Sequence, residues 1–237
     1  MTRIDDPAAV REQYASEANL AARKSIYADA TGPDARDMVL EAVAEVRPSS
    51  VLEVGCGEGE LAARIVLELG AEVVAIDQSA RMVELARARG VDARVGDVQE
   101  LPFDDAAFDV AVAAWMLYHV ADVGRALGEL ARVLRPDGRL VAVTNASDHL
   151  HEMLELAGVD DWDFSFRAEN GSELLRRHFA SVEARDASGT VTLHDADQIR
   201  SYLASSIRLR RWADRVPELE RPLVVRRHPV VFVAHKA

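Results

Sequence analysis

Val51 to Leu61 reads VLEVGCGEGEL, a buried-strand pattern that runs directly into a glycine-rich turn. Such turns between a strand and a helix usually bind phosphate, because backbone N–H groups at the helix N-terminus attract anions. Here the turn follows one carboxylate, Glu53, and carries another, Glu58, among its glycines. Two acids would repel phosphate, so the stretch predicts an α/β fold whose ligand carries positive charge.

Strand and helix patterns alternate outward from this turn, as in a parallel sheet covered by helices. The predicted strands are 50–55, 72–77, 91–97, 108–115 and 140–145, and the helices between them are 58–69, 80–89 and 122–134. Ser79 is placed to cap the second helix, and the RPDGR stretch at 135–139 predicts a stop and turn. Residues 48–145 therefore predict a doubly wound sheet.

The flanking segments are less regular. Residues 8–46 predict two helices, and the later part predicts helices at 172–179 and 195–215 with strands at 182–186 and 190–193. A final apolar strand, 229–236, could pair antiparallel at the edge of the sheet.

Composition is that of an ordinary soluble protein, with 49% hydrophobic and 29% charged residues in 237. The N-terminal stretch lacks the apolar centre of a signal peptide, no run is long enough to span a bilayer, and the single cysteine excludes an internal disulfide. We therefore expect a cytoplasmic protein that does not bind membranes.

Net charge argues against nucleic acid as a partner. The formal charge is −12, and residues 1–150 hold 26 acids against 15 lysines and arginines. Nucleic acid normally needs a basic face. The one basic cluster, Ser205–Arg215, is either a solvated helix face or a site for an acidic substrate or partner.

Three ligands are possible for the glycine turn. A P-loop needs Lys-Ser/Thr after its glycines, whereas Glu-Gly-Glu-Leu follows Gly57. A dinucleotide site needs Gly-x-Gly-x-x-Gly, and the spacing of Gly55, Gly57 and Gly59 is one residue too tight. S-adenosylmethionine, with a sulfonium, an ammonium and no phosphate, tolerates acids. Asp77, 20 residues after Gly57, is then placed for the ribose, and Asp97 for the adenine.

Five stretches in order (VLEVGCGEG, VVAID, GDVQELPF, FDVAVAAWMLYHV and VLRPDGRLV) resemble the successive motifs of class I S-adenosylmethionine-dependent methyltransferases, in their type 11 small-molecule branch. The resemblance spans roughly residues 48–145. It implies a Rossmann-like α/β sheet of seven strands, mostly parallel with an antiparallel last strand. It further implies one domain over 1–237, with a helical lid (1–47), a cofactor-binding core (48–145), a substrate cover (146–228) and a last strand (229–237).

The same resemblance implies a role for each matching residue. The cofactor would be S-adenosylmethionine, leaving as S-adenosylhomocysteine. The resemblance implies that the methionine end of the cofactor is surrounded by Glu53, Gly55, Cys56, Gly57 and Gly59. The ribose would contact Asp77 and Gln78, and the adenine would contact Asp97 and Val98. Ala114 and Trp115 would lie at the sulfonium, and Tyr14 would contact the cofactor from the lid.

Methyl transfer is an in-line displacement that needs a base only when the acceptor must lose a proton. His119, after the fourth strand, is the candidate catalytic base, although it could equally support its loop. On the substrate side we expect Tyr27, Tyr118, Asn145 and His149. His149 and His151 have no further partner at a metal-ligand spacing, so no metal is expected.

The expected acceptor is a small molecule, with oxygen, nitrogen and carbon acceptors all left open. Trp162, Phe164, Phe166 and Trp212 could line an apolar pocket or form the core of the cover. The chain could be a monomer or a homodimer. The remaining alternatives are a non-catalytic S-adenosylmethionine-binding protein and an NAD-dependent oxidoreductase.

Overall fold

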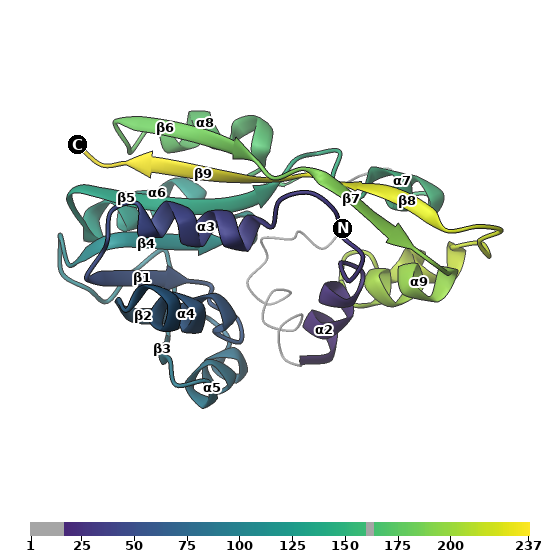
Figure 1. The fold of residues 1–237 in the computed structure, drawn as a ribbon, viewed down its shortest axis with the longest axis horizontal. Coiled ribbons are helices and arrows are strands. Elements are labelled where there is room, and N and C mark those ends of the chain that lie inside the picture. The colour runs from purple at the N-terminus through teal and green to yellow at the C-terminus, as the bar shows by residue number, and fades with distance from the viewer. Residues whose placement is uncertain (1–16, 160–163) are drawn as a thin grey trace.

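A computed structural model describes residues 17–159 and 164–237 of the chain (Figure 1). Its central feature is a seven-stranded sheet in the order β3-β2-β1-β4-β5-β9-β6. The strands are β1 (Ser50–Val54), β2 (Glu72–Asp77), β3 (Asp92–Val95), β4 (Phe108–Ala114), β5 (Leu134–Asn145), β6 (Ser181–Asp186) and β9 (Pro229–His235). The first five are parallel, and β9 runs antiparallel to both of its neighbours. This confirms the predicted fold class.

The last strand lies inside the sheet, so the prediction that it would form the edge is wrong. β9 pairs with β5 on one side and with β6 on the other. Its sequence, PVVFVAH, is buried over its first six residues, as an interior strand requires. β6, with the sequence SVEARD, has charged and mostly exposed side chains, which suit an unpaired edge.

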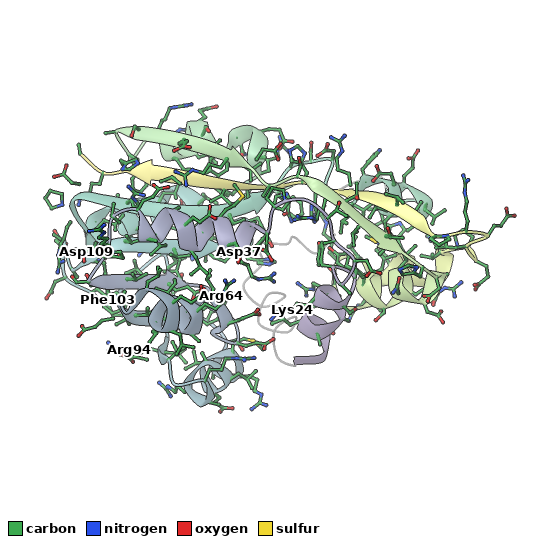
Figure 2. All side chains as sticks on the ribbon, viewed as in Figure 1. Lys24, Asp37, Arg64, Arg94, Phe103 and Asp109 are labelled. Atoms are coloured by element: carbon green, nitrogen blue, oxygen red, sulfur yellow. The ribbon has the colours of Figure 1, made fainter. Side chains whose placement is uncertain are left out.

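Helices cover both faces of the sheet because neighbouring strand residues point to opposite sides. Val51 of β1 packs with α3 (Ala35–Ala44), α4 (Glu60–Arg64) and α5 (Ala80–Ala88). Leu52, the next residue, packs with α6 (Val123–Val133) and α8 (Ala168–Leu175). A π-helical turn, η1 (Ile65–Leu69), continues α4 to the left-handed Gly70. An ion pair of 2.9 Å between Asp37 and Arg64 joins α3 to α4 (Figure 2).

The RPDGR stretch does not interrupt the sheet, contrary to the predicted turn. The pairing of β5 with β4 starts at Leu134, opposite Phe108, and resumes with Arg139 opposite Val110. Four residues of β5 thus lie opposite a single residue of β4, Asp109. One of these four, Asp137, has a left-handed φ of 62°. The stretch is therefore a large β-bulge within one strand, and α6 ends at Val133 rather than at the turn.

A second, smaller unit packs beside the sheet (Figure 1). It comprises an antiparallel pair of strands, β7 (Gly189–Leu193) and β8 (Leu223–Arg227), with α7 (His151–Leu156), α9 (Ala196–Ala204) and the 3-10 helix η3 (Arg210–Arg215). The N-terminal helix α2 (Glu17–Ser25) packs against α9. The predicted helix 195–215 is two separate helices in the structure, α9 and η3. After α9 ends, the Ser205 hydroxyl donates to the Tyr202 carbonyl.

The aromatic residues of the cover belong to the core. Phe164, Phe166 and Trp212 are all less than 9% exposed, and Phe164 also borders a small pocket. Trp162 lies outside the described residues. Across the described parts of the chain, no helix is long and apolar enough to cross a membrane.

Candidate active site

The carboxyl ends of the parallel strands open into a cavity of about 810 Å³. Within it the structure brings together fifteen of the seventeen predicted site residues: Glu53, Gly55, Cys56, Gly57, Asp77, Gln78, Asp97, Val98, Ala114, Trp115, His119, Tyr27, Tyr118, Asn145 and His149. Gly59 does not line the cavity, and Tyr14 lies outside the described residues. This volume is within the range of small-molecule and cofactor sites.

Two glycines of the turn have left-handed backbones for different reasons. Gly55, with a φ of 66°, lies so close to Met116 that an added Cβ would come within 2.6 Å of its Cβ. Gly57, with a φ of 53°, has no atom within 4 Å of an added Cβ and lines the cavity. Gly55 therefore allows the turn to pack on the loop after β4, whereas Gly57 leaves open space where a ligand can approach the backbone.

Gly59 serves helix packing rather than the cavity. Its φ is 74°, and an added Cβ would lie 2.7 Å from the Cβ of Ala86 and 2.9 Å from its Cα. Ala86 belongs to α5, so Gly59 lets the start of α4 approach that helix. Its expected place beside the methionine end of the cofactor stays a prediction.

Replacing Gly59 with alanine should lower the free energy of unfolding by about 3 kcal/mol, because a positive φ and a steric clash add together. Gly70 offers a matched control, since its φ is 69° and nothing lies within 4 Å of an added Cβ. Gly70→Ala should cost about 1 kcal/mol, the backbone cost alone. Urea denaturation of both variants measures the difference, and equal losses would contradict the packing role of Gly59.

Glu53 is a buried carboxylate at the bottom of the turn. It is 3% exposed, and its Oε2 atom has no hydrogen-bond partner among the described residues. Burial raises its pKa to about 8, and repulsion from Asp77 adds to this, while a hydrogen bond from the Ala62 backbone acts in the opposite direction. A buried carboxylate without a full set of partners favours a ligand that brings a cation.

Glu58 lines the cavity, and its carboxylate also pairs with cations of the protein. Its carboxylate lies 2.6 Å from Arg89 and 3.3 Å from Lys24. Lys24, on α2, also lies 2.7 Å from Glu60. Figure 2 shows the position of Lys24 at α2. The acids on the outer side of the turn thus hold α2 next to the cavity.

Asp77 holds the glycine turn as well as facing the cavity. Its Oδ2 accepts the Gly57 N–H and its Oδ1 accepts the Ser79 N–H, both at 2.9 Å. Burial raises the pKa of Asp77 above its ordinary value, and these two hydrogen bonds partly oppose the rise. Each carboxylate oxygen retains a lone pair for a further donor. Asp97 is exposed and lines the cavity, and its carboxylate accepts the backbone and side-chain N–H groups of Gln99 in its own turn.

Trp115 adopts a strained backbone at the end of β4. Its φ is 53°, which is rare for a bulky residue, and its N–H donates to the Val143 carbonyl. The indole Nε1–H donates to Asn145 Oδ1 at 3.2 Å, and the Arg36 guanidinium lies 5.4 Å from the ring centre. Asn145 therefore fixes the orientation of Trp115, which lines the cavity.

His149 is a buried histidine with both ring nitrogens engaged. Its Nδ1 accepts the His228 backbone N–H at 2.8 Å, so the proton of the neutral ring is on Nε2. That Nε2–H faces the Tyr27 hydroxyl oxygen at 3.0 Å. Burial, together with the positive charges of His228 and Arg227, lowers the pKa of His149 to about 3. His149 thus positions Tyr27 and has no free nitrogen to accept a proton from a substrate.

The imidazole of His149 should remain neutral with its proton on Nε2 from pH 5 to pH 9, because its pKa is about 3. Nitrogen-15 NMR of histidine-labelled protein distinguishes this tautomer from the others. Protonation of the His149 ring above pH 5 would contradict the assignment.

His119 and Tyr118 border both the main cavity and a side pocket of about 70 Å³. They belong to the 3-10 turn η2 (Leu117–His119), and their rings meet edge to face with centroids 4.5 Å apart. The apolar wall of the side pocket is formed by Leu150, Leu154, Phe164 and Leu209. The role of His119 as a base stays a prediction.

Comparison with known proteins identifies the segment that carries the glycine turn. The model of a family described as "Methyltransferase domain", of type 11, matches residues 52–142. Residues 52–142, less than half of the chain, are thus similar to this methyltransferase family. An uncharacterized methyltransferase of Mycobacterium tuberculosis is 39% identical over 134 residues, 54% of this chain and 53% of the relative. A malonyl-[acyl-carrier protein] O-methyltransferase of Pseudescherichia vulneris is 38% identical over 119 residues, 49% and 47% of the two chains. The chain thus spans about half the length of these relatives.

Solved structures show the same fold at low sequence identity. The YcgJ protein of Bacillus subtilis has a TM-score of 0.64 and 18% identity over 85% of this chain and 97% of that one. A second structure is phosphoethanolamine N-methyltransferase 2 of Haemonchus contortus, in complex with phosphomonomethylethanolamine and S-adenosylhomocysteine. Its TM-score is 0.65 at 15% identity, over 100% of this chain and 60% of that one. The methyltransferase fold of this chain therefore extends beyond the matched core.

Several residues of the cavity were not predicted from the sequence, among them two arginines and a tyrosine. Arg36, Tyr202 and Arg227 all line it, from α3, α9 and β8. None lies in a motif of the core, and Arg227 belongs to a strand that the sequence pattern did not predict. Among the described residues, no group of three or more acids, histidines or cysteines is arranged to hold a metal ion.

Proposed function

We propose that this protein is an S-adenosylmethionine-dependent methyltransferase that transfers a methyl group to a small-molecule acceptor by in-line displacement. The observation that carries the proposal is Glu53, a buried carboxylate with one unpartnered oxygen beside the glycine turn. Such a group disfavours the pyrophosphate of a dinucleotide and favours the ammonium of an amino acid.

The cavity residues fit the cofactor from end to end. Glu53 would hold the ammonium of the methionine end, and Arg36, beside Trp115, is placed for its carboxylate. Gly57 leaves space for the ligand at the backbone, and the free lone pairs of Asp77 can accept the ribose hydroxyls. Asp97 and Val98 border the part of the cavity expected to take the adenine.

When bound, the cofactor supplies a methyl group on a positively charged sulfur, which is a good leaving group. The protein then needs mainly to align the acceptor with that methyl group and to exclude water. Trp115, fixed by Asn145, would form the wall between the two ligands, and His149 and Tyr27 would border the acceptor. His119 is the remaining candidate base for an acceptor that must lose a proton.

Incubation with S-adenosylmethionine and a panel of small phenols, amines and carboxylic acids tests the proposal, with S-adenosylhomocysteine as the measured product. Product formation that depends on one acceptor class is the expected result. Binding of NADH, with no binding of S-adenosylhomocysteine, would overturn the proposal in favour of an oxidoreductase. Tight binding of S-adenosylhomocysteine without turnover on any member of the panel would favour a cofactor-binding protein.

A further inference from the structure

Arg227 brings a buried positive charge to the cavity. It is 7% exposed, lies at the end of β8 and lines the cavity wall. Its Nε donates to the Thr31 carbonyl at 2.8 Å and its Nη2 donates to the Pro33 carbonyl at 2.5 Å. Both partners are neutral, and no carboxylate in the described part of the chain forms an ion pair with Arg227.

One edge of the Arg227 guanidinium remains available. Nε and Nη2 form the edge that faces the two carbonyls, which leaves three of the five N–H groups, two of them on Nη1. Within the described residues, Nη1 has no hydrogen-bond partner and is not among the fully buried unsatisfied atoms, so it retains accessible surface. Nη1 and Nη2 together present the paired donors that match the two oxygens of a carboxylate.

The neighbours of Arg227 place it on the acceptor side of the cavity. Its chain neighbour His228 donates its backbone N–H to His149 Nδ1 at 2.8 Å, and the other ring nitrogen of His149 lies 3.0 Å from the Tyr27 hydroxyl. Arg227, His149, Tyr27 and Tyr202 all line the same cavity. Arg36, in contrast, lies against Trp115, with its guanidinium 5.4 Å from the ring centre. The two arginines therefore serve different parts of the cavity.

The charge balance indicates what the acceptor brings. A buried guanidinium with only neutral partners is costly unless a ligand supplies the counter-charge. The Arg227 guanidinium, whose hydrogen-bond partners are both neutral, matches the single negative charge of a carboxylate. A second guanidinium, that of Arg23, borders the cavity and the side pocket and donates to the Ser205 carbonyl at 3.1 Å. The adjoining side pocket has an apolar wall of leucines and a phenylalanine, which suits a short apolar body.

We propose that Arg227 binds a carboxylate of the methyl acceptor, so that the substrate is a small carboxylic acid with an apolar body. This inference rests on the proposed function, because it assigns the acceptor half of the same cavity. It makes Arg227 a specificity-determining residue.

The test compares matched probes on the complex with S-adenosylhomocysteine. Benzoate, 3-phenylpropanoate and hexanoate are compared with their primary amides and with phenyl phosphate, by saturation-transfer NMR and by the shift in Tm. We expect at least one carboxylate to bind about tenfold more tightly than its amide, since a charge-assisted bidentate pair replaces a neutral one. Equal binding of each acid and its amide, or binding of phenyl phosphate alone, would overturn the proposal. These comparisons use the wild-type protein and do not depend on any variant folding.

Arg227→Met then assigns the effect to the residue, with Arg226→Met as the matched control. Arg226 is exposed, pairs with Asp148 and does not line the cavity. Carboxylate binding should be lost in Arg227→Met and kept in Arg226→Met, with unchanged affinity for S-adenosylhomocysteine in both. Weaker binding of S-adenosylhomocysteine to Arg227→Met would show that Arg227 holds the cofactor and would overturn the proposal. Failure of the wild type to bind S-adenosylhomocysteine would instead refute the proposed function.

Discussion

Replacing Asp77 with alanine should weaken the binding of S-adenosylhomocysteine by at least about 100-fold, because two hydrogen bonds to a charged group are lost. In the ligand-free protein the same carboxylate accepts the N–H groups of Gly57 and Ser79. The variant therefore loses both the acceptor for the ribose and the anchor of the turn. Calorimetric titration measures the affinity, and circular dichroism checks that the fold persists.

Asp92→Ala is the matched control for this variant. Asp92 is an exposed acid on the adjacent strand β3, pairs with Arg94 and does not line the cavity. Its affinity for S-adenosylhomocysteine should equal that of the wild type. Asp97→Ala should fall between the two, at about a tenfold loss, because its carboxylate is exposed. An Asp77→Ala affinity within about threefold of wild type would show that the ribose is held by other groups.

Glu53→Gln should separate cofactor binding from stability, since it removes a carboxylate that is costly to bury. The folded-state pKa of Glu53, about 8, lies above its ordinary value of 4.5. The unfolded chain therefore releases this proton first, and the group lowers stability progressively as pH rises from 4.5 to 8. Glu53→Gln lacks this loss, so at pH 8 its ligand-free Tm should be higher than that of the wild type by a few degrees, and the gap should close toward pH 4.5.

The same variant should lose a proton signature on binding. At pH 7 a group with a pKa of about 8 is mostly protonated, and an ammonium placed beside it favours its ionised form. Binding of S-adenosylhomocysteine to the wild type should therefore release about one proton, measured by calorimetry in buffers of different ionisation enthalpy. Glu53→Gln should release fewer protons and bind more weakly. Equal proton release in the two proteins would contradict the pairing of Glu53 with the ammonium.

The parts of the fold that depend on local sequence were predictable. The bounds of β2 match the prediction, and Ser79 caps α5 through a hydrogen bond from the Met82 N–H, because strand patterning and capping are short-range properties. The position of β9 between β5 and β6 was not, since a continuous apolar run predicts a buried strand but not its neighbours.

The site shows the same division. Glu53, Gly57 and Asp77 fall where the motif predicts, because the strand and the turn that carry them are contiguous or adjacent in the sheet. The sequence pattern does not reveal that Glu58 pairs with Lys24 and Arg89, because both cations are distant in sequence. Arg227 reaches the cavity only because β8 pairs with β7. Such contacts depend on tertiary packing, and one sequence contains no local pattern for them.

The central claim, that the cavity binds S-adenosylmethionine, is tested most directly by calorimetric titration of the wild-type protein with S-adenosylhomocysteine and, in parallel, with NADH. We predict saturable one-to-one binding of S-adenosylhomocysteine with proton release at pH 7, and no heat of binding for NADH. Saturable binding of NADH, with none of S-adenosylhomocysteine, would contradict it.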